Sequence, residues 1–522
     1  MKTDTATASP ALEATMPEKE MTFNLNLSDR GTIYEEIDKS NAISLPDEKI
    51  SALRFYDLVY RTLCAVMFNH SSSGHPGGSV SSGRIVESLL LSMMRYDFTN
   101  PNDKTADFIC YTAGHKSLGL YAMWACRDEV MRITNPDALP ENPQRIRLED
   151  LLGFRKNPVT KTPLFKKFSS QALDGHPTPQ TPFVWASTGP SGVGVTSSVG
   201  IALALKDTYG ENAPYVNLIE GEGGMTPGRV SEALAAAASS RLNNIIMHVD
   251  WNQAAIDSNS VTREGNRPGD YAQWDPREFL LVHGFNVINV EDGFDFNQIH
   301  SAQERALALE NTAPTAIVYR TTKGWRYGVE GKKSHGGGHK FCSDGYYEAI
   351  APFEKELGLK FPRFEGEKNS ESVEKAYFDS LLIIRKAFEA ESEHTGRLGK
   401  LFSDRKDAHS RSKHPLVSEK INLSVLYESD KVTPQARPES CRYEIDSSQT
   451  LRGALAHVLN ELNHLTGGAI LATAADVYGS TNTLDIGKGF GDGLWRWPDN
   501  TNSRIFSAGG ITEDAIGGIC SG

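Results

Sequence analysis

Two polar residues at the ends of neighbouring apolar runs have the chemistry to bind a metal ion. Glu222 lies in the glycine-rich sequence Gly221-Glu222-Gly223-Gly224, and Asn252 follows about 30 residues later. Carboxylate, amide and main-chain oxygens are hard ligands that suit Mg²⁺ or Ca²⁺, and the glycines let the backbone approach a phosphate closely. Glycine and asparagine are also ordinary turn formers at strand ends, so this stretch alone leaves both interpretations open.

Histidines occur in four loops that are rich in glycine or proline. The loops contain SGHPGG at His75, AGH at His115, GHP at His176 and SHGGGH, which carries both His335 and His339. Several imidazoles around one pocket can donate hydrogen bonds and relay protons near neutral pH. A single histidine beside glycine or proline is usually a solvated turn residue, and each loop taken alone favours that interpretation.

A predicted βαβ unit positions Glu222 and Asn252. An apolar β-rich run covers residues 215–219, an alanine-rich helix covers 228–242, and a second β-rich run at 245–249 ends shortly before Asn252. Because the crossover makes the two strands parallel, both residues leave at the carboxyl edge of the sheet, where open α/β sheets bind ligands.

The rest of the chain reads as an α/β protein with two structured regions. We divide it into a polar N-terminal extension (1–45), a first α/β domain (46–392), a charged linker (393–439) and a second, incomplete α/β region (440–522). The extension is expected to form a mobile arm or to wrap along a neighbour. Further predicted strands lie at 107–112, 285–290, 315–319, 469–474 and 505–507, and further helices begin at Asp47 and cover 83–96, 371–391 and 451–465.

Composition excludes several functional classes. A net charge of −12 without a long basic run argues against nucleic acid as the main partner. The six cysteines have neither disulfide nor zinc-ligand spacing, which favours a reducing cytoplasm. The N-terminus has no apolar signal-peptide core, and no segment approaches 18 uninterrupted apolar residues, so we expect a soluble protein without a membrane partner.

Together these sequences resemble the thiamine diphosphate-dependent transketolase family. The spacing of Glu222 and Asn252 resembles the family's GDG and distant N, the histidine loops occur in the family's order, and TGPSGVG follows the GHP loop. In the second region AADVYGS contains Asp476, and GGITEDAIGGI around Glu513 is similar to the family's GIREHAMGAI.

The resemblance, which covers about residues 47–522, implies the thiamine diphosphate-binding fold. It implies a complete diphosphate-binding domain and a partial pyrimidine-binding domain, with parallel sheets flanked by helices. The implied cofactors are thiamine diphosphate and Mg²⁺ (or Ca²⁺). The implied reaction, that of the pentose phosphate pathway, transfers a two-carbon ketol unit between sugar phosphates, from a ketose to an aldose. A homodimer is implied because in the family the cofactor lies between the first domain of one subunit and the second domain of its mate.

The resemblance also assigns roles to individual residues. The metal would be held by Glu222, Asn252 and the backbone carbonyl of Ala254. Catalysis would use Glu513, which would hydrogen-bond the aminopyrimidine ring, together with His75, His115, His176 and His339. The cofactor would contact Gly189, Pro190, Ser191, Gly192, Gly221, Gly223, Gly224 and Asp476. The substrate would contact Ser480 and His335, the latter also being the competing candidate for the role of His339. Turn or helix-end chemistry is the alternative explanation for Asp476, Ser480 and Glu513.

Three positions depart from the family pattern. Glu222 stands where an Asp is usual, Pro227 where a Glu contacts the neighbouring subunit, and Gln449 where an Arg binds phosphate. The sequence stops soon after Glu513, so we expect activity to need a missing C-terminal part or a separate chain that supplies it. Two other functions therefore stay open. One is the decarboxylase component of a homodimeric 2-oxo acid (pyruvate) dehydrogenase, suggested by SGHPGGSVSS and SVTREGN. The other is a catalytically silent, cofactor-binding subunit of a split enzyme.

Overall fold

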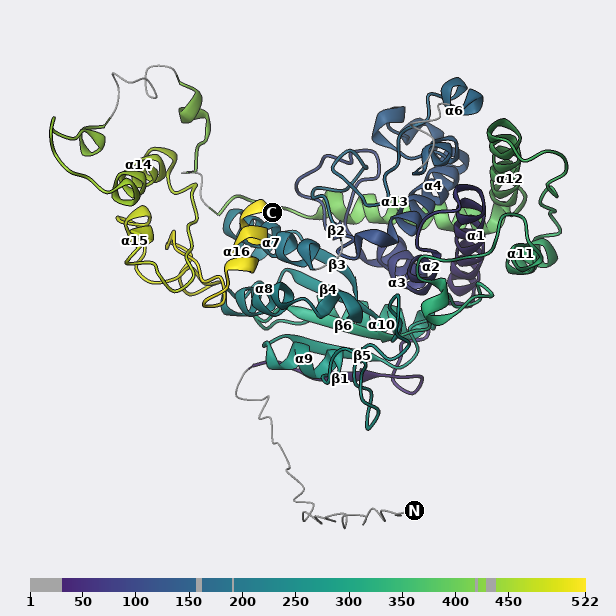
Figure 1. The fold of residues 1–522 in the computed structure, drawn as a ribbon, viewed down its shortest axis with the longest axis horizontal. Helices are drawn as coiled ribbons and strands as arrows, with labels where there is room; N and C mark the ends of the chain where they lie inside the picture. Colours follow the sequence, from purple (N-terminus) through teal and green to yellow (C-terminus); the bar gives the residue numbers. More distant parts are fainter. Residues whose placement is uncertain (1–30, 156–161, 190–191, 418–420, 429–437) are drawn as a thin grey trace, which may run out of the picture.

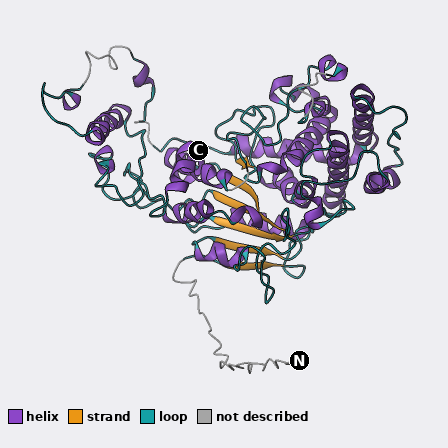
Figure 2. Cartoon of the chain, viewed as in Figure 1, coloured by secondary structure: helices purple, strands orange, loops and turns teal. Residues whose placement is uncertain are grey.

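The computed structural model describes residues 31–155, 162–189, 192–417, 421–428 and 438–522. Within them one sheet of parallel strands has the order β1-β5-β6-β4-β3-β2, and helices cover both of its faces (Figures 1 and 2). The strands are β1 (Tyr34–Ile37), β2 (Phe108–Cys110), β3 (Val216–Gly221), β4 (Ile245–Trp251), β5 (Asn286–Val290) and β6 (Thr315–Arg320). The helices are α1 (Asp47–Ser71), α2 (Pro76–Ser81), α3 (Gly83–Ser88), α4 (Ser117–Thr134), α6 (Pro163–Lys167), α7 (Val193–Tyr209), α8 (Gly228–Ser239), α9 (Pro276–Val282), α10 (Phe296–Leu307), α11 (Asp344–Leu357), α12 (Ser370–Ala390), α13 (Ser392–Arg411), α14 (Leu451–Thr466), α15 (Thr483–Ile486) and α16 (Glu513–Ser521).

The predicted βαβ unit is confirmed as β3, α8 and β4. The two strands pair in parallel, with Val216 opposite Ile245 and Gly221 opposite Asp250. Both strands are almost entirely buried, which explains why their sequences are continuous apolar runs rather than alternating ones. Their carboxyl ends therefore meet at one edge of the sheet, as expected.

Side chains of β4 alternate between two hydrophobic cores. Met247 and Val249 pack into the core beneath α7, α8 and α9, whereas Ile246 packs into the core beneath α10. Successive strand residues point to opposite faces. Asp250 consequently lies on the face of Ile246, away from α8.

A third hydrophobic core lies among the long helices, where α1 packs against α4, α12 and α13. Here the structure corrects one prediction, because the linker expected at 393–439 begins with the helix α13. Leu398 and Phe402 are both fully buried, one helical turn apart, and Phe402 contacts Tyr56 of α1 with a ring separation of 6.4 Å. The apolar face of α13 thus outweighs the charged composition that suggested a linker.

The N-terminal extension is also partly ordered, which corrects the predicted mobile arm for its last residues. Strand β1 extends the sheet by pairing with β5, from Tyr34 opposite Val287 to Ile37 opposite Val290. The backbone of β5 would otherwise present unpaired groups at the sheet edge, and β1 satisfies them. Residues 1–30 lie outside the described part of the chain.

The region after residue 438 differs most from expectation. Helix α14 matches its prediction and α16 begins at Glu513, but the described residues of this region contain isolated bridges in place of the expected strands. Ala472 bridges Ile505, and Trp495 bridges Phe506, both in parallel. Left-handed backbone follows both runs, at Asp476 (φ 57°) and at Gly509 (φ 99°).

Specific contacts anchor this region to the first domain. Arg504 donates two hydrogen bonds of 2.8 Å to Asp207 of α7, and the indole of Trp495 donates a third to the same carboxylate. Helix α16 lies directly on α7, whereas α14 and α15 form a lobe away from the sheet (Figure 1). In the part of the chain that the structure describes, no helix has the length and apolar character needed to cross a membrane.

Candidate functional site

A cavity of about 530 Å³ opens at the carboxyl edge of the sheet. Its floor is formed by the residues that follow β3, β4 and β6, and its walls by the histidine-bearing loops. Residues predicted from the sequence that line it are His75, His115, His176, Gly221, Glu222, Gly223, Gly224, Asn252, Ala254 and His335. The cavity thus gathers segments from most of the first domain.

Glu222 and Asn252 lie side by side on the floor of the cavity. The Asn252 backbone N–H donates to Oε2 of Glu222 at 3.2 Å, and the Ala254 backbone N–H donates to Oδ1 of Asn252 at 3.0 Å. The second oxygen of Glu222, Oε1, is buried and has no hydrogen-bond partner within the described residues. A buried carboxylate oxygen without a donor, beside an amide oxygen, fits a hard divalent cation.

A lysine that the sequence reasoning did not select reaches the same place. The Lys323 ammonium donates to the Ala254 carbonyl at 2.8 Å and lies 2.6 Å from Nδ1 of His335. Burial lowers the pKa of Lys323 to about 8. Burial, reinforced by the nearby charge of Asp250, raises the pKa of Glu222 to about 7, against the opposing effect of Lys323. A cation at Ala254 would share that carbonyl with Lys323, which is feasible because a carbonyl oxygen has two lone pairs.

Three histidine rings form a cluster above this floor. The ring centroids of His75, His115 and His335 are 5.0 to 5.3 Å apart. Nδ1 of His75 lies 2.9 Å from the His335 carbonyl, which can only accept, so Nδ1 carries the proton and Nε2 is left as an acceptor. His176 lines the same cavity from the loop before α7.

These histidines are neutral at physiological pH. Burial is the largest cause that lowers the pKa of each of them, and nearby cationic groups add to it. For His335 the pKa falls to about 3, with Lys323 the main contributor after burial. A neutral imidazole keeps one donor and one acceptor, so this cluster can bind hydroxyl groups and pass a proton between them.

His339 lies apart from this cluster. Its Nε2 is 2.7 Å from the Tyr327 carbonyl and its ring lies against the Tyr327 ring, with centroids 4.9 Å apart. Of the two histidines in the SHGGGH loop, the structure therefore brings His335 into the cavity.

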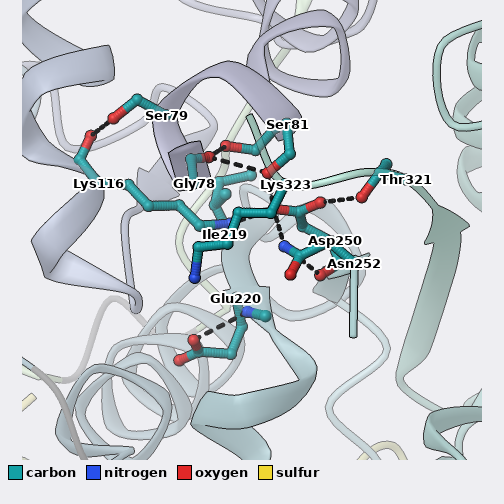
Figure 3. Close-up of polar contacts among 12 residues, drawn as sticks. Gly78, Ser79, Ser81, Lys116, Ile219, Glu220, Asp250, Asn252, Thr321 and Lys323 are labelled. Atoms are coloured by element: carbon teal, nitrogen blue, oxygen red, sulfur yellow. Dashed lines mark hydrogen bonds and ion pairs between the residues drawn. The ribbon is translucent and has the colours of Figure 1, made fainter. Parts of the chain in front are cut away.

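Asp250 is the centre of a buried hydrogen-bond network beneath the cavity (Figure 3). It accepts from the Lys116 ammonium at 2.8 Å, the Ser81 hydroxyl at 2.6 Å, the Asn252 amide at 3.0 Å and the Thr321 hydroxyl. Burial alone would raise the pKa of Asp250, but Lys116 and the hydroxyl donors outweigh burial and lower it. Asp250 is therefore an anion whose charge is matched by Lys116.

Several predicted residues lie outside the cavity. Gly189 and Gly192 precede α7, and Gly192 has the left-handed φ of 74° that glycine favours; Pro190 and Ser191 lie outside the described residues. Glu513, Asp476 and Ser480 are exposed in the C-terminal region, and none of the three lines the cavity in the single chain.

The sequence reasoning missed Lys116, Asp250 and Lys323. For Lys323 a signal existed, because RTTKG directly follows the strand predicted at 315–319, and the same carboxyl-edge argument that selected Asn252 applies to it. Lys116 adjoins His115, but its pairing with a residue of β4 has no local signature.

Comparison with known proteins shows which proteins this chain resembles. Residues 146–365 match the family described as "Transketolase, thiamine diphosphate binding domain". A transketolase of Physarum polycephalum is 27% identical over 87% of this chain and 60% of its own length, and the transketolase-like protein 2 of Bos taurus is 31% identical over 51% of this chain and 35% of its own. The solved transketolase of Leishmania mexicana has a TM-score of 0.60 and 21% identity, covering 90% of this chain and 62% of that one.

These matches agree with the geometry of the site. The chain spans about three fifths of the length of the Physarum relative. The matched segment contains β3 and β4, and with them Glu222 and Asn252 on the cavity floor. Residues 146–365 of this chain are thus similar to the thiamine diphosphate binding domain of the transketolase family.

Proposed function

We propose that this chain binds thiamine diphosphate together with Mg²⁺ or Ca²⁺ in the carboxyl-edge cavity and serves the transfer of a two-carbon ketol unit from a ketose phosphate to an aldose phosphate. The observation that carries the proposal is the buried, partnerless Oε1 of Glu222 beside Asn252, beneath a cluster of neutral histidines. A cation site and a set of proton-exchanging groups are thus combined in one cavity.

Each group of residues in the cavity would have a separate role in binding. Glu222, Asn252 and the Ala254 carbonyl would hold the cation, and the backbone at Gly223 and Gly224 would approach the phosphates. When bound, thiamine diphosphate would supply a carbon nucleophile for chemistry at a ketose carbonyl. The histidine cluster would bind the hydroxyl groups of the sugar and hold or release protons at the Nε2 atoms.

The C-terminal residues would act on a second copy of the chain. Glu513 opens α16 with an exposed side chain, and Asp476 and Ser480 are exposed as well, so all three are free to contact another subunit. We assign them to a partial pyrimidine-binding domain (440–522) that serves the diphosphate-binding domain (46–392) of a homodimeric partner. All six cysteines are described and none is disulfide-bonded, which supports a cytoplasmic protein.

Calorimetric titration with thiamine diphosphate tests the cofactor assignment. Binding is expected with MgCl₂ and should weaken strongly in Glu222→Ala and Asn252→Ala, but not in the surface control Glu371→Gln. Absence of binding to the wild-type chain at millimolar cofactor would refute the proposal.

Two assays on the loaded protein then distinguish the alternatives. Release of an aldose from a ketose phosphate supports ketol transfer, whereas pyruvate decarboxylation without it would favour the 2-oxo acid dehydrogenase component. Cofactor binding with neither activity would identify a catalytically silent subunit.

A further inference from the structure

The proposed function assigns no role to the Lys116–Asp250 ion pair. Both side chains are almost completely buried, with 2% of Lys116 and none of Asp250 exposed, and their charged atoms are 2.8 Å apart. A buried ion pair seldom adds net stability, because desolvation costs as much as the attraction returns. Because the ion pair lies under the cavity, its position suggests a role in ligand binding and not in stability.

The pair stands where the loops of the site meet. Ser81 ends the helix that follows His75, Lys116 follows His115, and Thr321 precedes Lys323 by two residues. All three donate to Asp250, which also accepts from the metal-site residue Asn252 (Figure 3). Asp250 thereby joins two histidine loops, the end of β6 and the cation site through one carboxylate.

The charges around the cavity show why the ammonium of Lys116 matters. Glu220, Glu222 and Lys116 line the cavity directly, and Asp250 lies just below it. Lys323 is the other cation on the floor, and it is engaged with Ala254 and His335. Without Lys116, the anion Asp250 would lie uncompensated in a low-dielectric floor, next to Asn252 and close to the carboxylate of Glu222.

We infer that Lys116 is a specificity-determining residue, whose ammonium cancels the charge of Asp250 so that the cavity accepts the anionic diphosphate end of the cofactor. The inference rests on the proposed function. It predicts that loss of the Lys116 charge weakens the binding of thiamine diphosphate. The binding of thiamine, which has no phosphates, should be unchanged or tighter. A purely structural ion pair would not make that distinction.

The test compares thiamine diphosphate with thiamine on the full 522-residue chain, in the presence of Mg²⁺, by calorimetry. Lys116→Gln keeps a hydrogen-bond donor but no charge, Lys116→Met removes both, and Lys116→Arg keeps the charge. We expect the first two to raise the Kd of thiamine diphosphate about tenfold or more, as an uncompensated charge nearby would. The Kd of thiamine should not rise, and Lys116→Arg should stay within about threefold of wild type.

Wild-type affinity for thiamine diphosphate in Lys116→Gln would overturn the inference, as would an equal loss of thiamine and thiamine diphosphate binding. Thermal melting of each variant shows whether it is folded. If the two neutral variants unfold, Lys116→Arg decides: affinity for thiamine diphosphate within about threefold of wild type supports the inference, and a loss specific to thiamine diphosphate overturns it. A wild-type chain that fails to bind thiamine diphosphate at all would refute the proposed function, which is a different result.

Discussion

Substitution of His248 should remove a defined part of the acid sensitivity of this protein. His248 lies in the middle of β4, with 1% of its surface exposed, and its ring nitrogens contact the Tyr319 hydroxyl at 3.0 Å and Oδ1 of Asn217 at 3.2 Å. Burial lowers its pKa from 6.5 to about 3. Between pH 6.5 and about pH 3, His248 is protonated in the unfolded chain but stays neutral in the folded chain.

The sign and size of the effect follow from that difference. The stability contributed by neutral His248 is complete above pH 6.5 and is lost progressively as the pH falls towards about 3, because protonation then favours the unfolded state. From pH 7.5 to pH 5.0 the loss is about 2 kcal/mol. His248→Gln cannot be protonated, so it should escape this loss, although it should cost about 1–2 kcal/mol at pH 7.5 through weaker packing and hydrogen bonding.

Urea unfolding followed by tryptophan fluorescence at pH 7.5 and pH 5.0 measures the difference. Other buried histidines also destabilise the wild type in acid, so the informative quantity is the free energy of unfolding of the wild type minus that of His248→Gln. This difference should fall by about 2 kcal/mol from pH 7.5 to pH 5.0, so that the advantage of the wild type disappears or reverses. His457→Gln, an exposed control on α14, should follow the wild type at both pH values. An unchanged difference for His248→Gln would show that burial does not keep this imidazole neutral.

Three further predictions concern the site and the packing beside it. Glu222→Gln should weaken Mg²⁺ binding in the presence of thiamine diphosphate by at least about tenfold in calorimetry, with little change in melting temperature, since Oε1 has no donor to lose. His335→Ala should lower turnover in the assembled enzyme by about 10²-fold or more, whereas His339→Ala should mainly lower the melting temperature; the reverse pattern would move the catalytic role to His339. Gly77→Ala should cost about 1–3 kcal/mol in urea unfolding because its β-carbon would lie 2.1 Å from a serine oxygen, while Gly479→Ala, with no atom within 4 Å, should be near neutral.

Local rules were enough to predict the βαβ unit at the floor of the cavity. The apolar runs at β3 and β4 and the alanine-rich helix between them fix a parallel pair, and the pair places Glu222 beside Asn252. This inference needs only strand length, crossover direction and the chemistry of the residue that follows each strand. The same reasoning, applied to β6, would have selected Lys323.

The remaining features depend on contacts between distant segments. The choice of His335 over His339 is decided by how the SHGGGH loop packs: the His335 carbonyl contacts His75, more than 200 residues earlier in the chain. Phe402 of α13 packs against Tyr56 of α1, and the charged sequence of α13 does not reveal this contact. Strand pairing in the C-terminal region is limited to single bridges, a tertiary outcome that β-propensity does not register.

The register of the sheet also accounts for how a glutamate can stand where the family has an aspartate. Gly221 is opposite Asp250, so Glu222 leaves β3 one residue before Asn252 leaves β4, and its side chain must cross that offset to reach the cation site. With its extra methylene it does so: Oε2 accepts from the Asn252 backbone and Oε1 remains without a partner. Asp250 holds the Asn252 amide through Nδ2, which leaves Oδ1 as the amide atom available to a metal. The position of the proposed cation site is therefore set by strand register and by Asp250.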